Sequence, residues 1–70
     1  MKNRDVKNVL KYFNFNLKDF SEYSGISYSI LLRFSQYPDR ILKYDYEKAL
    51  FDFIKFKKGL SFADVKTIFN

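Results

Sequence analysis

Hydroxyl, amine, guanidinium and carboxylate groups carry whatever chemistry this chain can do, because it contains no cysteine and no histidine. A zinc site, a disulfide and a histidine-based catalytic pair are therefore excluded. Serine and lysine occur, but no glycine-rich phosphate loop and no paired nucleophile and base accompany them. Carboxylates such as Asp5 and Asp19 stand at positions that suit helix caps. We therefore expect no enzymatic activity, no cofactor and no bound metal.

The chain carries an excess of positive charge, which is the other chemical property that its residue types provide. Thirteen lysine and arginine residues stand against eight aspartate and glutamate residues, which leaves a formal net charge of +5. On a body this small, such an excess favours anionic partners, of which nucleic acid is the commonest. Ordinary solubilising charge would look the same. The charge alone therefore leaves both interpretations open.

Seventy residues allow one domain, which we assign to the whole range 1–70. A chain this short buries only roughly 60% of the surface that its unfolded form exposes, so its core must be efficient. No apolar run approaches the roughly 20 residues of a membrane-spanning helix. No apolar stretch follows the N-terminus as it would in a signal peptide. We expect a cytoplasmic protein without a membrane partner.

Apolar residues recur three and four positions apart in five short stretches, which is the spacing of helices that bury one face. No strand alternation, internal repeat or linker interrupts them, so we predict a compact all-α fold of five helices. The first helix is expected to be capped by Asn3 or Asp5 and to end at Asn14–Asn16, and the second to lie between Asn16 and Gly25. The third is expected to cover Tyr28 to about Gln36, and the fourth Tyr46 to about Lys58. The last follows Ser61, and its apolar positions are Phe62, Val65, Ile68 and Phe69.

Polar residues at the predicted helix starts support these boundaries. Asn16 with Asp19, and Ser61 with Asp64, have the spacing of capping boxes, and Asp45 is expected to cap the fourth helix. Ile41 and Leu42 are expected to fold back onto the core. The lysines at the end of the fourth helix complement its dipole. The predicted core comprises Phe13, Phe20, Ile26, Leu31, Phe34, Leu50, Phe53 and Ile54.

The stretch from Leu17 to Gln36 has the residues that two helices joined by a tight turn require. A small residue, Ser21, stands where the helices would cross, and Gly25 would provide the left-handed conformation of the turn. Ile26 would fill the space between the helices. Alone, Gly25 would be explained equally well as an ordinary helix end. The accompanying residues at the required spacings favour the joined pair.

This stretch resembles the helix-turn-helix of the Cro and phage-repressor (XRE-type) family. That family shares the pattern of an apolar and then a small residue, glycine, an aliphatic residue, serine, and later an aliphatic residue before arginine. Here the pattern is Phe20-Ser21, Gly25-Ile26-Ser27 and Leu32-Arg33. The five-helix layout with a proline-containing loop is similar as well. The resemblance implies a small DNA-binding transcription regulator, such as the repressor of a phage or mobile element.

The resemblance also implies roles for individual residues on double-stranded DNA. The third helix would place its N-terminal end in the major groove, so Ser27, Tyr28 and Ser29 would face base edges or phosphates. Arg33 would reach a phosphate or a guanine. For three other basic residues, the resemblance implies contacts with the DNA backbone: Lys18, Arg40 and Lys43. From the residues alone, Arg33 could equally pair with Glu22 or Asp39 on the surface, and Tyr28 could be half-buried packing.

Apolar residues leave a second interpretation open. The exposed face of the third helix is expected to lack Gln, Asn or a second Arg for base contacts and to carry Ile30 and Leu32. These two residues could contact thymine methyl groups, pack inside the domain or form a patch for a protein partner. Fifteen aromatic residues exceed what the domain can bury, and Phe51 and Phe56 lie off the inward face of the fourth helix. An exposed patch of this kind normally marks an interface. We expect a homodimer through the last two helices, or alternatively a helix-turn-helix scaffold that binds and inhibits a protein partner.

Overall fold

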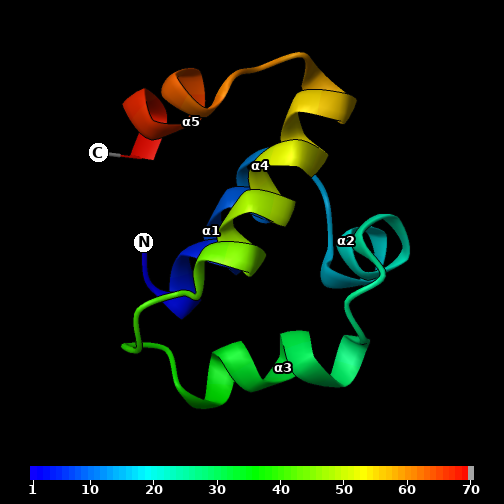
Figure 1. The fold of residues 1–70 in the computed structure, drawn as a ribbon, viewed down its shortest axis with the longest axis vertical. Coiled ribbons are helices and arrows are strands. Elements are labelled where there is room, and N and C mark those ends of the chain that lie inside the picture. Colours follow the sequence, from blue (N-terminus) through cyan, green and yellow to red (C-terminus); the bar gives the residue numbers. More distant parts are fainter. Residues whose placement is uncertain (70) are drawn as a thin grey trace.

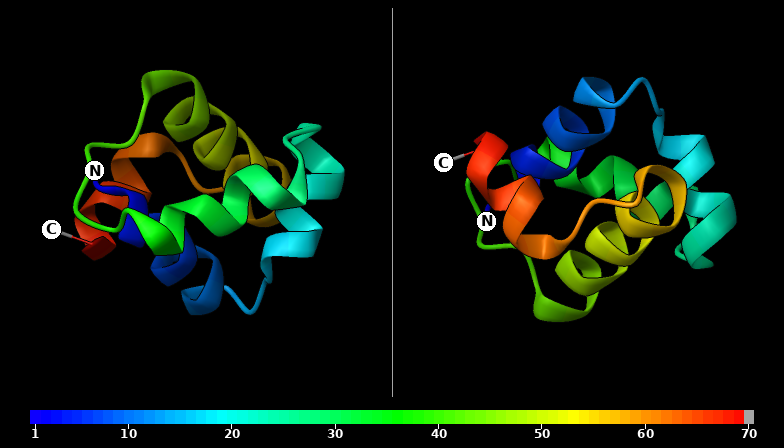
Figure 2. Two further views of the ribbon diagram at one scale, coloured as in Figure 1. Left: turned by 90° about the horizontal axis from the view of Figure 1, so that it is seen from below. Right: turned by 90° about the horizontal axis from the view of Figure 1, so that it is seen from above.

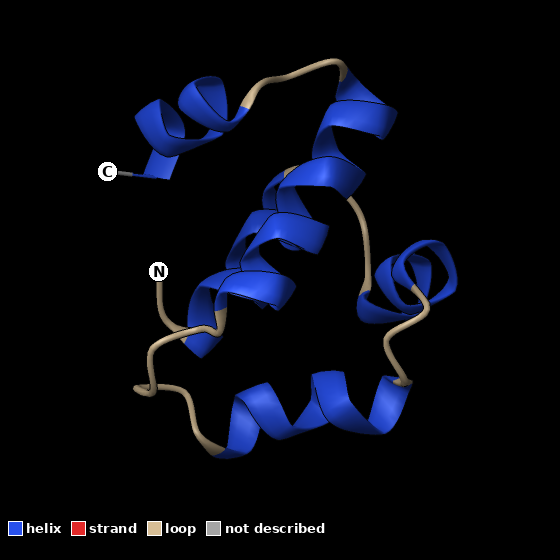
Figure 3. Cartoon of the chain, in the orientation of Figure 1, coloured by secondary structure: helices blue, strands red, loops and turns tan. Residues whose placement is uncertain are grey.

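The computed structural model describes residues 1–69 and is all-helical over that range, as predicted. Its helices are α1 (Asn3–Tyr12), α2 (Leu17–Ser24), α3 (Tyr28–Gln36), α4 (Tyr44–Lys58) and α5 (Phe62–Phe69) (Figure 3). The described residues also form one isolated antiparallel β-bridge, between Lys2 and Ile41. The predicted bounds of the third helix are confirmed.

The helices are arranged so that α3 and α5 lie at opposite ends of the molecule (Figure 1). α3 packs against α1 and α2, α2 also packs against α4, and α5 contacts α4. The molecule measures 28 × 25 × 20 Å. Seen from below, α3 crosses the front of the molecule, with α1 on one side of it and the start of α4 on the other (Figure 2). None of the described helices has the length and apolar character needed to cross a membrane.

One hydrophobic core joins all five helices. Seven of the eight predicted core residues are buried, whereas Ile26 is only half-buried and packs against the core from the turn between α2 and α3. The buried core residues are Val6, Val9, Leu10, Phe13, Phe20, Leu31, Phe34, Leu42, Leu50, Phe51, Phe53, Ile54 and Val65. Of the four apolar positions expected in the last helix, only Val65 is buried, because α5 rests on the core through one face alone.

Local hydrogen bonds fix the helix ends where the sequence predicts caps. The Asp19 N–H donates to Asn16 Oδ1 (2.8 Å), and the Asn16 N–H donates to Asp19 Oδ2 (3.0 Å). Ser61 and Asp64 make the same reciprocal pair at the start of α5. Asp5 accepts the N–H of Lys2, so it belongs to the first turn of α1, and the residue before that helix is Lys2 rather than Asn3. These bonds satisfy N–H groups that the helix itself cannot pair.

Two expectations about the chain between α3 and α4 are wrong. α4 begins at Tyr44 after Lys43, so Asp45 lies in the first turn and is not the cap. Ile41 is 82% exposed, while Leu42 is buried. The backbone pairs with the N-terminal segment here, because the Leu42 N–H donates to the Met1 carbonyl and Ile41 bridges to Lys2. Successive side chains of an extended segment point to opposite sides, so only one of the two can reach the core.

The aromatic residues of α4 divide between interior and surface. Phe56 is exposed as expected. Phe51 is buried, contrary to its expected place off the inward face, because Phe62 of α5 packs on it with ring centroids 4.4 Å apart. α5 therefore covers part of α4 that the helical periodicity of α4 alone assigns to solvent.

Candidate nucleic-acid interface

The turn between α2 and α3 is built by three hydroxyl groups and one glycine. Gly25 ends α2 in the left-handed conformation, with φ +77°. The Ser21 hydroxyl donates to the Ile26 carbonyl (2.6 Å), and the Ser24 hydroxyl accepts the Ile26 N–H (3.1 Å). Ser27 then caps α3 by accepting the Ile30 N–H (3.3 Å). The turn and the start of α3 are therefore held from both sides, which fixes the direction of α3.

α3 buries one side and presents the other to solvent. Leu31 and Phe34 are buried, and Ile30 is half-buried. The exposed side, here called the α3 ridge, comprises Tyr28, Ser29, Leu32, Arg33 and Gln36. Tyr28 is 49% exposed and Leu32 is 44% exposed. The expectation that this face lacks a glutamine is wrong, because Gln36 belongs to its last turn.

A surface hollow of about 600 Å³ lies on one flank of the α3 ridge, between α3, the following loop and the start of α4. Three of its lining residues, Arg33, Arg40 and Lys43, are cationic, and among the described residues that line it none is acidic. We call it the loop-side hollow. The guanidinium of Arg40 lies over the Tyr37 ring, 4.3 Å from its centroid. The Asn3 side-chain amide donates to the Tyr37 carbonyl (3.0 Å) and ties this loop to α1.

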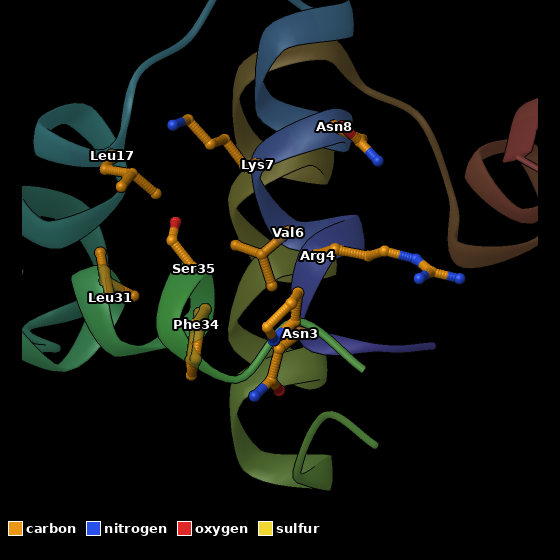
Figure 4. Close-up of a pocket in the computed structure, with 10 residues that line it drawn as sticks. Asn3, Arg4, Val6, Lys7, Asn8, Leu17, Leu31, Phe34 and Ser35 are labelled. Carbon is orange, nitrogen blue, oxygen red and sulfur yellow. The ribbon is translucent and has the colours of Figure 1, made fainter. Parts of the chain in front are cut away.

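A second, smaller hollow of about 260 Å³ lies on the opposite flank of α3, against α1 and the start of α2. We call it the α1-side hollow. In Figure 4, Lys7 points across it toward Leu17 and Ser35, while the Arg4 side chain points away. Arg4 is instead paired with Asp39. Within the described lining of this hollow, too, no residue is acidic.

The structure therefore brings most of the predicted site residues together. Ser27 is exposed at the cap of α3, and Tyr28, Ser29 and Arg33 are exposed along its first two turns. Arg40 and Lys43 join Arg33 in the loop-side hollow. Lys18 lies on α2 and does not line the loop-side hollow, but it shares another hollow with Ser21, Glu22 and Tyr28. Tyr28 thus links the Lys18 position with the α3 ridge.

The cations at this site are not neutralised within the described part of the chain. The ion pairs found there are Arg4 with Asp39 and Lys48 with Asp52. Arg33 therefore pairs with neither Glu22 nor Asp39, which were the surface alternatives for it. Several carboxylates are held elsewhere, since Asp5, Asp19 and Asp64 bond to the backbone at helix starts. An anion that reaches α3 meets free positive charge.

Besides Gln36, the sequence pattern misses Lys7 as a candidate residue. In the sequence it is simply a polar residue on the outer side of the first helix. Only the packing of α1 against α3 turns that position toward the flank of the α3 ridge. No spacing rule within α1 could reveal this, because the neighbour that matters is more than twenty residues away in the chain.

Among the described residues, no three His, Cys, Asp or Glu side chains are grouped so that they could hold a metal ion. Comparison of the chain with protein-family models, curated proteins and solved structures finds no match. The function of the chain is therefore inferred from the residues of the site itself.

Proposed function

We propose that the chain is a DNA-binding transcription regulator, of the repressor kind, whose α2 and α3 act as a helix-turn-helix. One observation carries the proposal: the exposed α3 ridge lies between two cationic hollows that have no acidic lining residue in the described range. A helix with its side chains is roughly 10–12 Å across. The major groove of B-DNA is roughly 12 Å wide, so cations on the two flanks of such a helix can reach both phosphate backbones.

In this function, the first turn of α3 supplies hydrogen-bonding groups for the groove. Ser29 and Tyr28 would face base edges or phosphates, and Gln36 adds an amide that can bond to adenine. Arg33 would contact a guanine or a phosphate. Arg40 and Lys43 on one flank, and Lys7 on the other, would hold the backbone and so fix the register of the helix. A regulator of this kind needs no catalytic group and would act in the cytoplasm.

A random-sequence selection on duplex DNA tests the proposal, followed by titration of the enriched duplex at two salt concentrations. We expect the selection to enrich a sequence that binds the wild type with an affinity that falls steeply with salt. Arg33→Ala should reduce the affinity for that sequence. Lys66→Ala, on α5 at the far end of the molecule, removes the same charge and is the matched control.

The way in which Arg33→Ala weakens DNA binding indicates what Arg33 contacts. If Arg33 reads a guanine, the loss should be roughly 1–3 kcal/mol and confined to duplexes that carry that base. If it contacts a phosphate, binding should weaken on all duplexes and the salt slope should fall by about one. An unenriched selection, together with equal binding by wild type and Arg33→Ala, would contradict the proposal.

Exposed apolar side chains favour a second candidate function, the binding and inhibition of a protein partner on the same scaffold. Leu32 stands in the middle of the α3 ridge, where a base-reading helix gains more from a polar residue. Tyr44 is 70% exposed and Phe56 is 69% exposed. If the DNA experiment fails, Leu32→Ser becomes the informative variant, because it should weaken the binding of a protein partner to α3 and leave the fold intact.

A further inference from the structure

The segment between Phe34 and Leu42 has no anchor in the hydrophobic core. Every residue at positions 35–41 is exposed, whereas Phe34 before them and Leu42 after them are buried. Burial of apolar side chains therefore fixes the two ends of this segment and leaves its middle to other interactions. Arg40, one of the three cations of the loop-side hollow, lies in that middle. Its position depends on the hydrogen bonds that hold the backbone there.

Positions 37–40 form a β-turn. The Arg40 N–H donates to the Tyr37 carbonyl (3.3 Å), which is the hydrogen bond that closes such a turn. Pro38 occupies the second position, where the fixed φ of proline is favourable. The guanidinium of Arg40 lies over the ring of Tyr37. The first and last residues of the turn are thus joined twice, once through the backbone and once through their side chains.

Asn3 bonds to both ends of this β-turn. Its side-chain amide donates to the Tyr37 carbonyl (3.0 Å), and its N–H donates to the Arg40 carbonyl (2.9 Å). Asn3 is half-buried and lines the loop-side hollow together with these two residues. One residue of α1 therefore holds the two carbonyl groups that mark the ends of the turn.

Arg4 bonds to the middle of the same turn. Its N–H donates to the Pro38 carbonyl (3.1 Å), and its guanidinium pairs with Asp39. The first N–H groups of a helix have no partner within the helix. In α1, those of Asn3 and Arg4 find their acceptors in the turn, so the helix start and the turn satisfy each other. Figures 1 and 2 show the start of the chain beside the loop that follows α3.

We propose that Asn3 is a positioning residue: it holds the β-turn in which Arg40 lies against Tyr37, and so it fixes the guanidinium for contact with a DNA phosphate. This role rests on the DNA-binding function proposed above. Asn3 supplies no charge and acts through the Tyr37 carbonyl. An arginine that is held in place before binding loses less conformational freedom when it contacts its partner. Asn3 therefore strengthens binding through the order that it gives to Arg40.

The effect of Asn3 is specific to Arg40 among the cations of the loop-side hollow. Arg33 belongs to α3, whose own hydrogen bonds fix its backbone. Lys43 follows the buried Leu42 and directly precedes α4, so the core and the helix hold its backbone. Loss of the Asn3 amide should therefore disturb Arg40 and leave the other two cations in place.

Nuclear magnetic resonance of Asn3→Ala tests the position of Arg40 without DNA. Protons held over the face of an aromatic ring are shifted upfield, so the δ-methylene protons of Arg40 report whether its side chain lies over Tyr37. We expect this upfield shift to decrease in Asn3→Ala. The Arg40 amide, which closes the turn, should exchange faster with solvent. Asn8→Ala makes the same change at an exposed position of α1 and should alter neither signal.

A double-mutant cycle on the enriched duplex tests whether Asn3 acts through Arg40. Asn3→Ala should weaken the binding of that duplex by about fivefold, which is the equivalent of one hydrogen bond. In the Arg40→Gln background, the same change should have almost no further effect, because the residue that Asn3 positions is already absent. In the Lys43→Gln background, it should keep its full effect. General loosening of the fold, or direct contact of Asn3 with DNA, would give equal losses in both backgrounds.

The outcomes separate this role from the function on which it rests. Far-UV circular dichroism verifies that each variant is helical, and if Asn3→Ala is unfolded, Asn3→Ser removes the same amide and replaces it. An unchanged Arg40 shift overturns the proposal, and so do equal losses in the Arg40→Gln and Lys43→Gln backgrounds. If Asn3→Ala loses the shift but the selection enriches no duplex for the wild type, the DNA-binding function fails and the positioning of Arg40 by Asn3 is upheld.

Discussion

Gly25 is the residue on which the turn before α3 depends most. Its φ is +77°, a conformation that residues with side chains rarely adopt, and a Cβ built there would meet no atom within 4 Å. The cost of a substitution is therefore one of backbone conformation and not of space. Gly25→Val should lose at least about 1 kcal/mol of unfolding free energy, because a β-branched residue strongly resists positive φ. Gly25→Asn should lose less, since asparagine tolerates this conformation.

Denaturant unfolding of the wild type, Gly25→Val and Gly25→Asn measures the order of their stabilities. Because a Cβ at this position meets no atom within 4 Å, the order of the two variants reports how well each residue tolerates the left-handed conformation. Equal midpoints for wild type and Gly25→Val would mean that the left-handed turn is absent in solution.

Ser21 holds the same turn through its side chain. Its hydroxyl is partly buried and donates to the Ile26 carbonyl at 2.6 Å. Ser21→Ala should lose about 1 kcal/mol, because the carbonyl is left without this donor. Ser35→Ala is the matched control, since Ser35 is exposed in α3. Thermal or urea unfolding gives both values, and equal losses would show that the Ser21 bond does not stabilise the turn.

Single residues were predictable from the sequence where their partners are close in the chain. The Asn16–Asp19 and Ser61–Asp64 pairs and the left-handed Gly25 are all settled within a few residues, so local spacing suffices. Ile41 was not predictable in this way. Its exposure depends on backbone pairing with Lys2, almost forty residues away in the chain.

At the scale of helices, the apolar periodicity predicts that each helix forms more accurately than it predicts where each helix begins and ends. All five helices were expected from apolar spacing, and the ends at Gly25 and Gly59 follow from glycine chemistry. The start of α4 was missed because Asp45 has the residue type of a cap, whereas the extended Lys43 precedes the helix without any side-chain bond. The burial of Phe51 was missed because a different helix, α5, causes it.

α5 gives a prediction about pH. The Ser61 N–H donates to the Asp64 carboxylate at 3.0 Å, and the Ser61 side chain also favours its charged form, so the pKa of Asp64 lies below the ordinary 3.8. A carboxyl group whose pKa is depressed on folding contributes stability above its unfolded pKa and loses it as the pH falls through the folded one. We expect the start of α5 to loosen at acid pH, below about 3.8.

Amide hydrogen exchange of Val65, whose N–H donates to the Ser61 carbonyl, reports this loosening directly. In Asp64→Ala, protection at Val65 should be lower above pH 3.8 and approach that of the wild type below it. The Asn16–Asp19 cap on α2 provides an internal comparison. Unchanged protection in the variant at neutral pH would show that the cap does not hold α5.

At the scale of the whole molecule, the candidate site and the C-terminal helix lie far apart. α3 and its two cationic hollows lie at one end, while α5 lies at the other (Figure 1). Most of the candidate site was predictable from residue type and motif, since Arg33, Arg40 and Lys43 do converge. Lys7 was not, because its place beside α3 arises from the packing of α1. Spacing within one helix carries no information about which other helix will cover it.

The arrangement of charge leads to the final prediction, which separates a DNA site from general attraction by a basic protein. Arg40→Gln with Lys43→Gln, and Lys57→Gln with Lys58→Gln, each lower the net charge from +5 to +3. The first pair empties the loop-side hollow of two cations, whereas the second lies in the last turn of α4. If α3 binds duplex DNA, the first pair should reduce the slope of log K against log salt by roughly two.

The Lys57 and Lys58 pair should leave that slope nearly unchanged, because neither residue lines a hollow beside α3. Fluorescence anisotropy of a labelled duplex at several salt concentrations measures both slopes with the same probe. Equal reductions would mean that binding follows net charge and that no part of the surface is special for DNA. A larger effect of the Lys57 and Lys58 pair would move the DNA contact to the end of α4 and away from α3.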